Sequence, residues 1–305
     1  MDREFGEAGS PRARPAQTTD HYPLTTDLFV TTAARETPAL REYAARLAEE
    51  LRCVVVSRRG SGMPALFASL PDARRAVIVQ TNRLFLVDRA GHSFFQHPNM
   101  GYLRFGHVSA GGQDTLLEAT EAAPGDAILD CTLGYASEAT LLSYAVGETG
   151  EVHGVEAVPE LGVVVRAGLQ TVVTGRPVLN DAMRRVRVVH LGPNLDYLRA
   201  CPDNRYDVVY FDPFFESVLE DSQPFAPIRL FGDHGRLTPE TIAEAMRVAR
   251  RSVVVKTTRW GEAFAELGIT ERLESRNGKV AYGIVRTGTV ATVRQPYAET
   301  CRPER

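Results

Sequence analysis

The sequence is poor in the features that mark several specialised classes of protein. No run of roughly 18 apolar residues occurs, so neither a membrane-spanning helix nor a membrane partner is predicted. No group of residues has metal-ligand spacing, and no metal is expected. The four cysteines show no paired spacing, which argues against a zinc site or a disulfide framework and favours a reducing cytoplasm. They are Cys53, Cys131, Cys201 and Cys301.

Lysine is almost missing from the chain. Of the 35 basic residues only Lys256 and Lys279 are lysine. A codon bias that affects the whole chain is one explanation, and selection of arginine for phosphate and base contacts is the other. The formal net charge of −3 does not exclude a nucleic-acid partner, because basic residues can gather on one face.

The length of 305 residues and the hydrophobic content of 44% favour one large globular domain beside a smaller one. Residues 1–27 are polar and lack the apolar segment of a secretory signal, so we expect a disordered leader. Residues 28–110 predict a small α+β domain. It would hold a helix at 38–51 with apolar residues at helical spacing, three β-rich runs and an irregular segment at 92–113. The runs are 53–57, 76–81 and 84–88.

Residues 111–290 have a different pattern, in which short apolar runs alternate with helical segments. This pattern is typical of a parallel sheet covered on both faces. Asn277-Gly278 then predicts an antiparallel hairpin near the end, followed by a tail at 291–305. The fold class is therefore α/β, with a Rossmann-like, mostly parallel sheet. The expected strands are 126–130, 151–156, 186–190, 206–212 and 252–257, and the expected helices are 138–146, 159–173 and 239–250.

In such a sheet a ligand binds beyond the carboxyl ends of the strands. Asp130 ends the first strand, and the loop after it contains Thr132 and Gly134 before a helix that Ser137 could cap. Small residues let a ligand approach the backbone. One glycine does not make a dinucleotide fingerprint, so a nicotinamide cofactor is not predicted. A purely structural turn is the alternative.

Two further strand ends carry polar residues. Glu156 ends the second strand, where an acid can bind a ribose diol, although an exposed acid before a helix would also be favourable. Asn194 follows the third strand and could offer its amide to a base edge or cap the next helix. Lys256 ends the fifth strand and should find either a phosphate or a carboxylate.

The fourth strand runs into Asp212-Pro213-Phe214-Phe215. Proline restricts its own backbone and that of Asp212, which holds the carboxylate at the rim of the pocket. An acceptor beside an aromatic ring can bind a flat heterocycle with an amino group and orient its nitrogen for attack. Burial in the core is the alternative for both phenylalanines, especially Phe214.

The connection from 216 to 238 is much longer than usual, which suggests a lid or a substrate-contacting segment. Arg229 could meet an RNA backbone there, although loop charges are commonly solvated.

Residues 212–215 resemble the D/N-P-P-Y/F motif of S-adenosylmethionine-dependent methyltransferases that modify amino nitrogens, with Phe214 in place of the second proline. Residues 130–136, in the form D-x-T-x-G-x-A, resemble the cofactor loop of one family, the RsmJ (YhiQ-like) small-subunit ribosomal RNA guanine-N2 methyltransferases. That family also has a D-P-x-F segment, here 212–215, a glycine-rich stretch, here 111–113, and a fifth strand ending V-V-V-K, here 253–256. The four matches span roughly residues 101–260.

The resemblance implies a class I methyltransferase, S-adenosylmethionine as cofactor and ribosomal RNA or the small subunit as partner. Cofactor contacts are expected from Asp130, Thr132, Gly134, Glu156 and Asn194. Catalytic contacts are expected from Asp212, Pro213 and Phe215. Substrate contacts are expected from Phe214, Lys256 and Arg229. A methyltransferase for DNA adenine, protein glutamine or a small molecule is the alternative, and a non-catalytic S-adenosylmethionine- or RNA-binding protein is the second.

Overall fold

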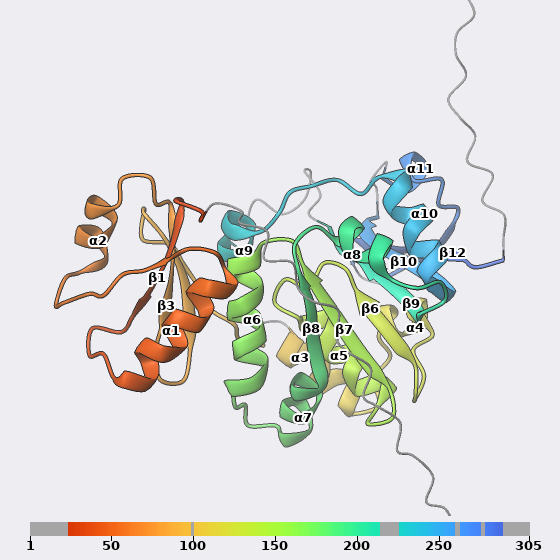
Figure 1. The fold of residues 1–305 in the computed structure, drawn as a ribbon. Helices are drawn as coiled ribbons and strands as arrows, with labels where there is room; N and C mark the ends of the chain where they lie inside the picture. Colours follow the sequence, from red (N-terminus) through yellow and green to blue (C-terminus); the bar gives the residue numbers. More distant parts are fainter. Residues whose placement is uncertain (1–23, 99–100, 214–225, 260–262, 276–277, 289–305) are drawn as a thin grey trace, which may run out of the picture.

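The computed structural model describes residues 24–98, 101–213, 226–259, 263–275 and 278–288, which build two sheets with helices packed on them (Figure 1). Most of the predicted leader, the whole predicted tail, and both Phe214 and Phe215 lie outside these residues. Within the described ranges no helix is long and apolar enough to cross a membrane.

The amino-terminal sheet has the strand order β2-β1-β3-β4-β5. Its first three members pair in parallel around β1, and β3, β4 and β5 pair antiparallel. The sequence did not predict β1, whose five residues are all buried and show no alternation. The strands are β1 (Leu28–Thr32), β2 (Val54–Val55), β3 (Arg75–Val79), β4 (Leu84–Asp88) and β5 (Ser93–Phe94).

Two helices pack against this sheet. Helix α1 (Pro38–Glu50) lies where the sequence predicts a helix, and Thr37 caps it by accepting a hydrogen bond from the Leu40 N–H at 3.3 Å. Its buried side chains join the main core. Helix α2 (Met63–Ser69) places Leu66 and Phe67 against the opposite face of the sheet.

The second sheet has seven strands in the order β11-β12-β10-β9-β6-β7-β8. The strands from β8 to β10 are parallel, and β12 and β11 are antiparallel. The predicted fold class, a mostly parallel sheet with an antiparallel hairpin, is confirmed. The strands are β6 (Ala127–Asp130), β7 (Glu151–Glu156), β8 (Val186–Leu191), β9 (Tyr206–Phe211), β10 (Ala249–Thr258), β11 (Glu271–Glu274) and β12 (Val280–Arg286).

Helices cover both faces of this sheet, because successive strand residues point to opposite sides. Tyr210 belongs to a core shared with α5, whereas Phe211 belongs to a core shared with α10. The helices of this part are α3 (Gly101–Ser109), α4 (Thr115–Thr120), α5 (Ser137–Val146), α6 (Pro159–Thr171), α7 (Pro177–Arg185), α8 (Asn194–Ala200), α9 (Ala226–Phe231), α10 (Pro239–Val248) and α11 (Ala263–Glu266).

Two local expectations were wrong. The segment expected to be irregular contains α3, whose Phe105 ring packs edge-on against Tyr144 of α5 at 4.9 Å between centroids. Ser137 is not a helix cap. Ala136 precedes α5 in a left-handed conformation with φ of 57° and makes no side-chain capping bond. The chain therefore enters α5 through a left-handed residue rather than through a side-chain cap.

The two sheets are joined through α6. This helix packs on β4, and Arg75 of β3 donates a hydrogen bond to Glu160 of α6 at 2.8 Å. Arg166, further along α6, forms two hydrogen bonds with Glu50 at the end of α1. The amino-terminal sheet is thus held beside the strand ends on which a ligand site is expected.

Candidate functional site

A cavity of about 270 Å³ opens at the carboxyl ends of the parallel strands, where the strand order reverses between β6 and β9. It brings together seven of the eleven residues that the sequence predicted for the site. They are Thr132, Gly134, Glu156, Asn194, Asp212, Pro213 and Lys256.

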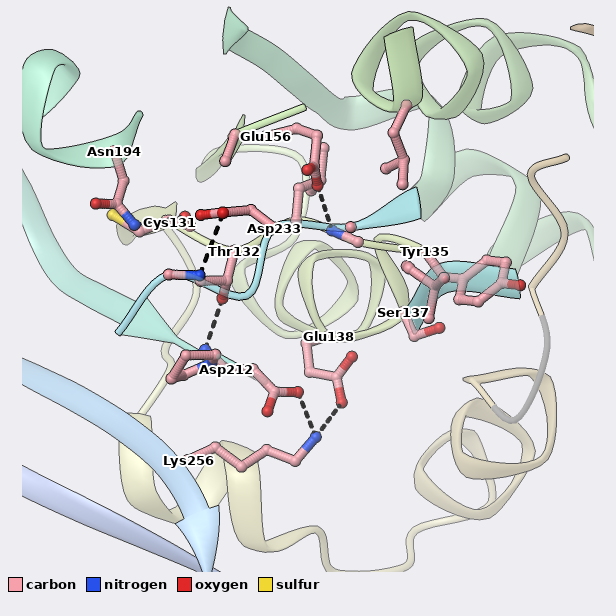
Figure 2. Close-up of a pocket in the computed structure, with 18 of the residues that line it drawn as sticks. Cys131, Thr132, Tyr135, Ser137, Glu138, Glu156, Asn194, Asp212, Asp233 and Lys256 are labelled. Carbon is pink, nitrogen blue, oxygen red and sulfur yellow. Dashed lines mark hydrogen bonds and ion pairs between the residues drawn. The ribbon is translucent and has the colours of Figure 1, made fainter. Parts of the chain in front are cut away.

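The loop after β6 is held by hydrogen bonds rather than by a run of glycines. Asp130 is buried, and it accepts a hydrogen bond from the Thr132 N–H at 3.0 Å. Burial raises the pKa of Asp130 to about 8. The Thr132 hydroxyl oxygen also accepts the backbone N–H of Asp212 at 2.6 Å. This threonine therefore ties the end of β6 to the end of β9 (Figure 2).

Gly134 gives this loop a close approach that a larger residue would strain. Its φ is 50°, and an added Cβ would lie 3.1 Å from Ile228 of α9. Its N–H donates to Glu156 Oε2 at 3.0 Å, so the loop is fastened to the end of β7.

Glu156 faces the cavity with little solvent around it. Its relative exposure is 6%. Burial raises its pKa to about 7, although hydrogen bonds from the N–H groups of Val158 and Gly134 oppose the shift. Each carboxylate oxygen accepts one of these bonds and keeps a lone pair, which suits a ligand with two adjacent hydroxyl groups.

Asn194 is the first residue of α8, and Pro193 is the cap, so the alternative in which Asn194 caps the helix was wrong. Its Nδ2 lies 3.3 Å from the Cys131 carbonyl oxygen, to which it donates. This bond aims the amide at the loop after β6, on the same side of the cavity as Glu156.

Asp212 and Lys256 lie side by side at the other end of the cavity. Lys256 Nζ is 2.5 Å from Asp212 Oδ2 and 3.1 Å from Glu138 Oε1. The lysine thus found carboxylates, as one of the two readings of the sequence expected. Burial raises the pKa of Asp212 and Lys256 lowers it, with a net rise. Lys256 is bonded to one of the two carboxylate oxygens, Oδ2.

Among the cavity-lining residues that sequence reasoning missed are Glu138 and Arg104, which form an ion pair with one another. Glu138, in the first turn of α5, lines the cavity and is bonded to both Lys256 and Arg104. Burial opposes its charge, but Lys256 and Arg104 outweigh that effect and lower its pKa to about 2. Its signal was an acid one turn after the cofactor loop. Arg104 gave none, because its segment showed no recognisable pattern.

Arg229 lies on α9 but is not among the residues that line the cavity. A ring nitrogen of His234 lies 2.8 Å from its carbonyl oxygen. Asp130 stands just behind the lining rather than in it, one residue before Cys131. The predicted contacts of Phe214 and Phe215 fall outside the described residues. Within those residues, no cluster of three potential metal ligands occurs.

Comparison with known proteins gives a family. The uncharacterized protein YpiP of Bacillus subtilis is 35% identical over 259 residues, which cover 85% of this chain and 99% of YpiP. The chain belongs to the YpiP family. No family model matches it.

The fold of this YpiP-family chain is also found among solved structures. The S-adenosylmethionine-dependent methyltransferase NGO1261 from Neisseria gonorrhoeae superposes with a TM-score of 0.59, over 85% of this chain and 96% of that one, at 17% identity. At this identity the likeness concerns the fold. The YpiP-family chain therefore has the class I methyltransferase fold that the sequence predicted.

Proposed function

We propose that this chain is an S-adenosylmethionine-dependent methyltransferase of the cytoplasm that methylates the exocyclic amine of guanine in small-subunit ribosomal RNA. The observation that carries the proposal is one cavity with two chemically different ends. Glu156, Gly134 and Asn194 lie at one end, and the Asp212–Lys256 pair lies at the other. The RsmJ-like motifs at residues 130–136 and 212–215 support the choice of RNA.

The first end fits the cofactor. Glu156 would accept the two ribose hydroxyls with the lone pairs that its backbone bonds leave, each such bond being worth roughly 1.5–3 kcal/mol. Gly134, where a Cβ would meet Ile228, would let the ligand lie against the backbone. When bound, S-adenosylmethionine supplies an electrophilic methyl group on a sulfonium.

The second end fits the edge of a nucleobase. Guanine presents N1–H and the N2 amine as donors beside the O6 acceptor. The Asp212 carboxylate would accept from the donors, and Lys256 has a third N–H for O6 besides the two bonded to Asp212 and Glu138. Orientation of the weakly nucleophilic amine is the main contribution expected from Asp212. After transfer the nitrogen releases its proton to Asp212 or to water.

Cytosine and adenine each present an amine next to a ring acceptor, and the Asp212–Lys256 pair could bind either base. Methylation of one of these bases is therefore the second candidate.

Transfer of a labelled methyl group decides between the substrate classes. The chain is incubated with tritiated S-adenosylmethionine and, separately, with small ribosomal subunits, naked ribosomal RNA, DNA or protein extract. Nuclease digestion and mass spectrometry then identify the methylated nucleoside. We expect N2-methylguanosine from RNA, and label only in protein, DNA or small molecules would reject the proposal.

Asp212→Ala separates an enzyme from a binding protein. We expect the variant to bind S-adenosylmethionine in calorimetry with an affinity close to that of the wild type, because Asp212 lies at the other end of the cavity from Glu156. Methyl transfer should be lost. A fully active variant would refute the role assigned to Asp212.

A further inference from the structure

A network of charged side chains connects the Asp212–Lys256 pair to α3 and to the start of α4. Glu138 Oε1 accepts from Lys256 Nζ at 3.1 Å and from Arg104 Nη1 at 3.0 Å. Arg104 in turn makes two hydrogen bonds with Asp114, at 2.5 and 2.8 Å. The five residues come from α3, the cap of α4, α5, the end of β9 and β10.

The far end of this network is firmly anchored. Asp114 caps α4 by accepting the Leu116 N–H at 2.9 Å, and it holds Arg104 through two parallel bonds, the geometry in which an arginine–carboxylate pair is strongest. Arg104 also donates to the Tyr282 hydroxyl at 3.3 Å. Glu138 is therefore fixed from one side before it meets Lys256 on the other.

The near end has fewer anchors. The backbone of Asp212 is held by Thr132, and among the described residues its carboxylate accepts a hydrogen bond from Lys256. Lysine has a long stem with four rotatable bonds. Without Glu138, Lys256 would keep one of its two carboxylates and would be free to follow Asp212 into other rotamers.

We propose that Glu138 and Arg104 are positioning residues, which hold Lys256, and through it the Asp212 carboxylate, in the orientation that meets the target base. The inference rests on the proposed function. It assigns a role in the reaction to two side chains that a purely structural ion-pair network would use only for stability.

The ionisation of Asp212 offers one readout, and the split between kcat and KM offers a second that a purely structural role would not move. Burial raises the pKa of Asp212, Lys256 lowers it, Glu138 raises it and Arg104 lowers it. The charge of Asp212 also raises the pKa of Asp130 on β6, of Tyr210 on β9 and of Tyr282 on β12. Removing the negative charge of Glu138 therefore lowers the pKa of Asp212. Activity that needs ionised Asp212 should then be lost at a lower pH.

The test uses the full chain with Glu138→Gln and, as a matched control, Glu148→Gln, since Glu148 is an exposed acid beyond the end of α5. With the RNA substrate we expect kcat of the Glu138 variant to fall about 10- to 100-fold, the range that a misplaced group produces. KM for S-adenosylmethionine should stay within about twofold. The acid limb of kcat/KM should move to lower pH. The control should match the wild type in all three.

An unchanged kcat together with an unchanged acid limb would overturn the inference. If Glu138→Gln fails to fold, Arg104→Lys keeps the charge but loses the paired geometry to Asp114, and the same kcat loss with normal cofactor affinity is expected. If the wild type methylates another substrate, the proposed function is wrong, and the positioning role is tested by measuring kcat of the variants with that substrate. If the wild type methylates guanine and both variants are normal, the positioning role alone fails. If no methyl transfer occurs at all, both fall.

Discussion

Asp130→Asn should stabilise the protein without ligand while weakening its cofactor site. Asp130 is 1% exposed, and burial raises its pKa from 3.8 to about 8. The folded state therefore binds a proton that the unfolded state releases. Because the pKa is raised on folding, the contribution of Asp130 to the free energy of unfolding is fully present below pH 3.8 and is lost as the pH rises towards 8. Asparagine has nearly the same shape, cannot ionise, and keeps an oxygen for the Thr132 N–H.

The size of the effect follows from the two pKa values. At about 1.4 kcal/mol per pH unit, the interval from 3.8 to about 8 gives an upper limit of about 6 kcal/mol. Relaxation around the charge reduces such a penalty, so we expect the variant to gain at least about 2 kcal/mol at pH 8. At pH 4 the two proteins should have similar stability.

Urea denaturation of both proteins from pH 4 to pH 9 measures this difference, and calorimetry measures binding of S-adenosylmethionine. The free-energy gap should widen with pH and level off above pH 8. A variant that is less stable than the wild type at pH 8, or a gap that does not change with pH, would refute the reasoning. Asp207→Asn is a suitable control. Burial opposes the charge of this carboxyl, but hydrogen bonds and Arg250 outweigh burial and lower its pKa, so the sign of the effect should reverse.

Further predictions concern the cavity. Glu156→Gln should weaken S-adenosylmethionine binding about 30-fold, equivalent to about 2 kcal/mol for loss of the charge on two hydrogen bonds. Since the pKa of Glu156 is raised to about 7, the affinity of the wild type should fall as the pH drops below about 7. A variant whose affinity depends on pH in the same way would contradict the assignment. Gly134→Ala should lower thermal stability by about 1 kcal/mol and reduce cofactor affinity, because it adds a Cβ at positive φ against Ile228; melting curves and calorimetry check this. Lys256→Met should reduce methyl transfer to guanine more than cofactor affinity, measured with the same labelled cofactor, and equal losses in both would point to a general structural defect.

The strand ends could be predicted from the sequence because they depend on local pattern. Apolar runs that stop at Asp130, Glu156 and Asp212 place those acids at one edge of a parallel sheet, whatever the helices between them do. The expected strands agree with the observed ones to within about three residues at their ends, and the neighbouring positions of the two halves of the cavity follow from that agreement.

The contacts between distant elements could not be predicted in this way. Glu138 and Lys256 are 118 residues apart in the chain, and Arg104 lies in a helix whose pattern was hidden by glycine, histidine and scattered aromatics. Which of several acids pairs with a lysine depends on side-chain reach in three dimensions. The sequence allowed a phosphate or a carboxylate for Lys256, and only the packing of α5 against the sheet brings Glu138 beside it.

The hydroxyl of Thr132 joins the end of β6 to the end of β9. The hydroxyl donates a hydrogen bond to Asp130 Oδ1, at 3.4 Å, and its oxygen accepts a hydrogen bond from the Asp212 N–H. A hydrogen bond therefore joins the loop proposed to bind the cofactor to the segment proposed to bind the methyl acceptor. Thr132→Val removes this hydrogen bond, so we expect the variant to hold Asp212 less firmly relative to the loop after β6.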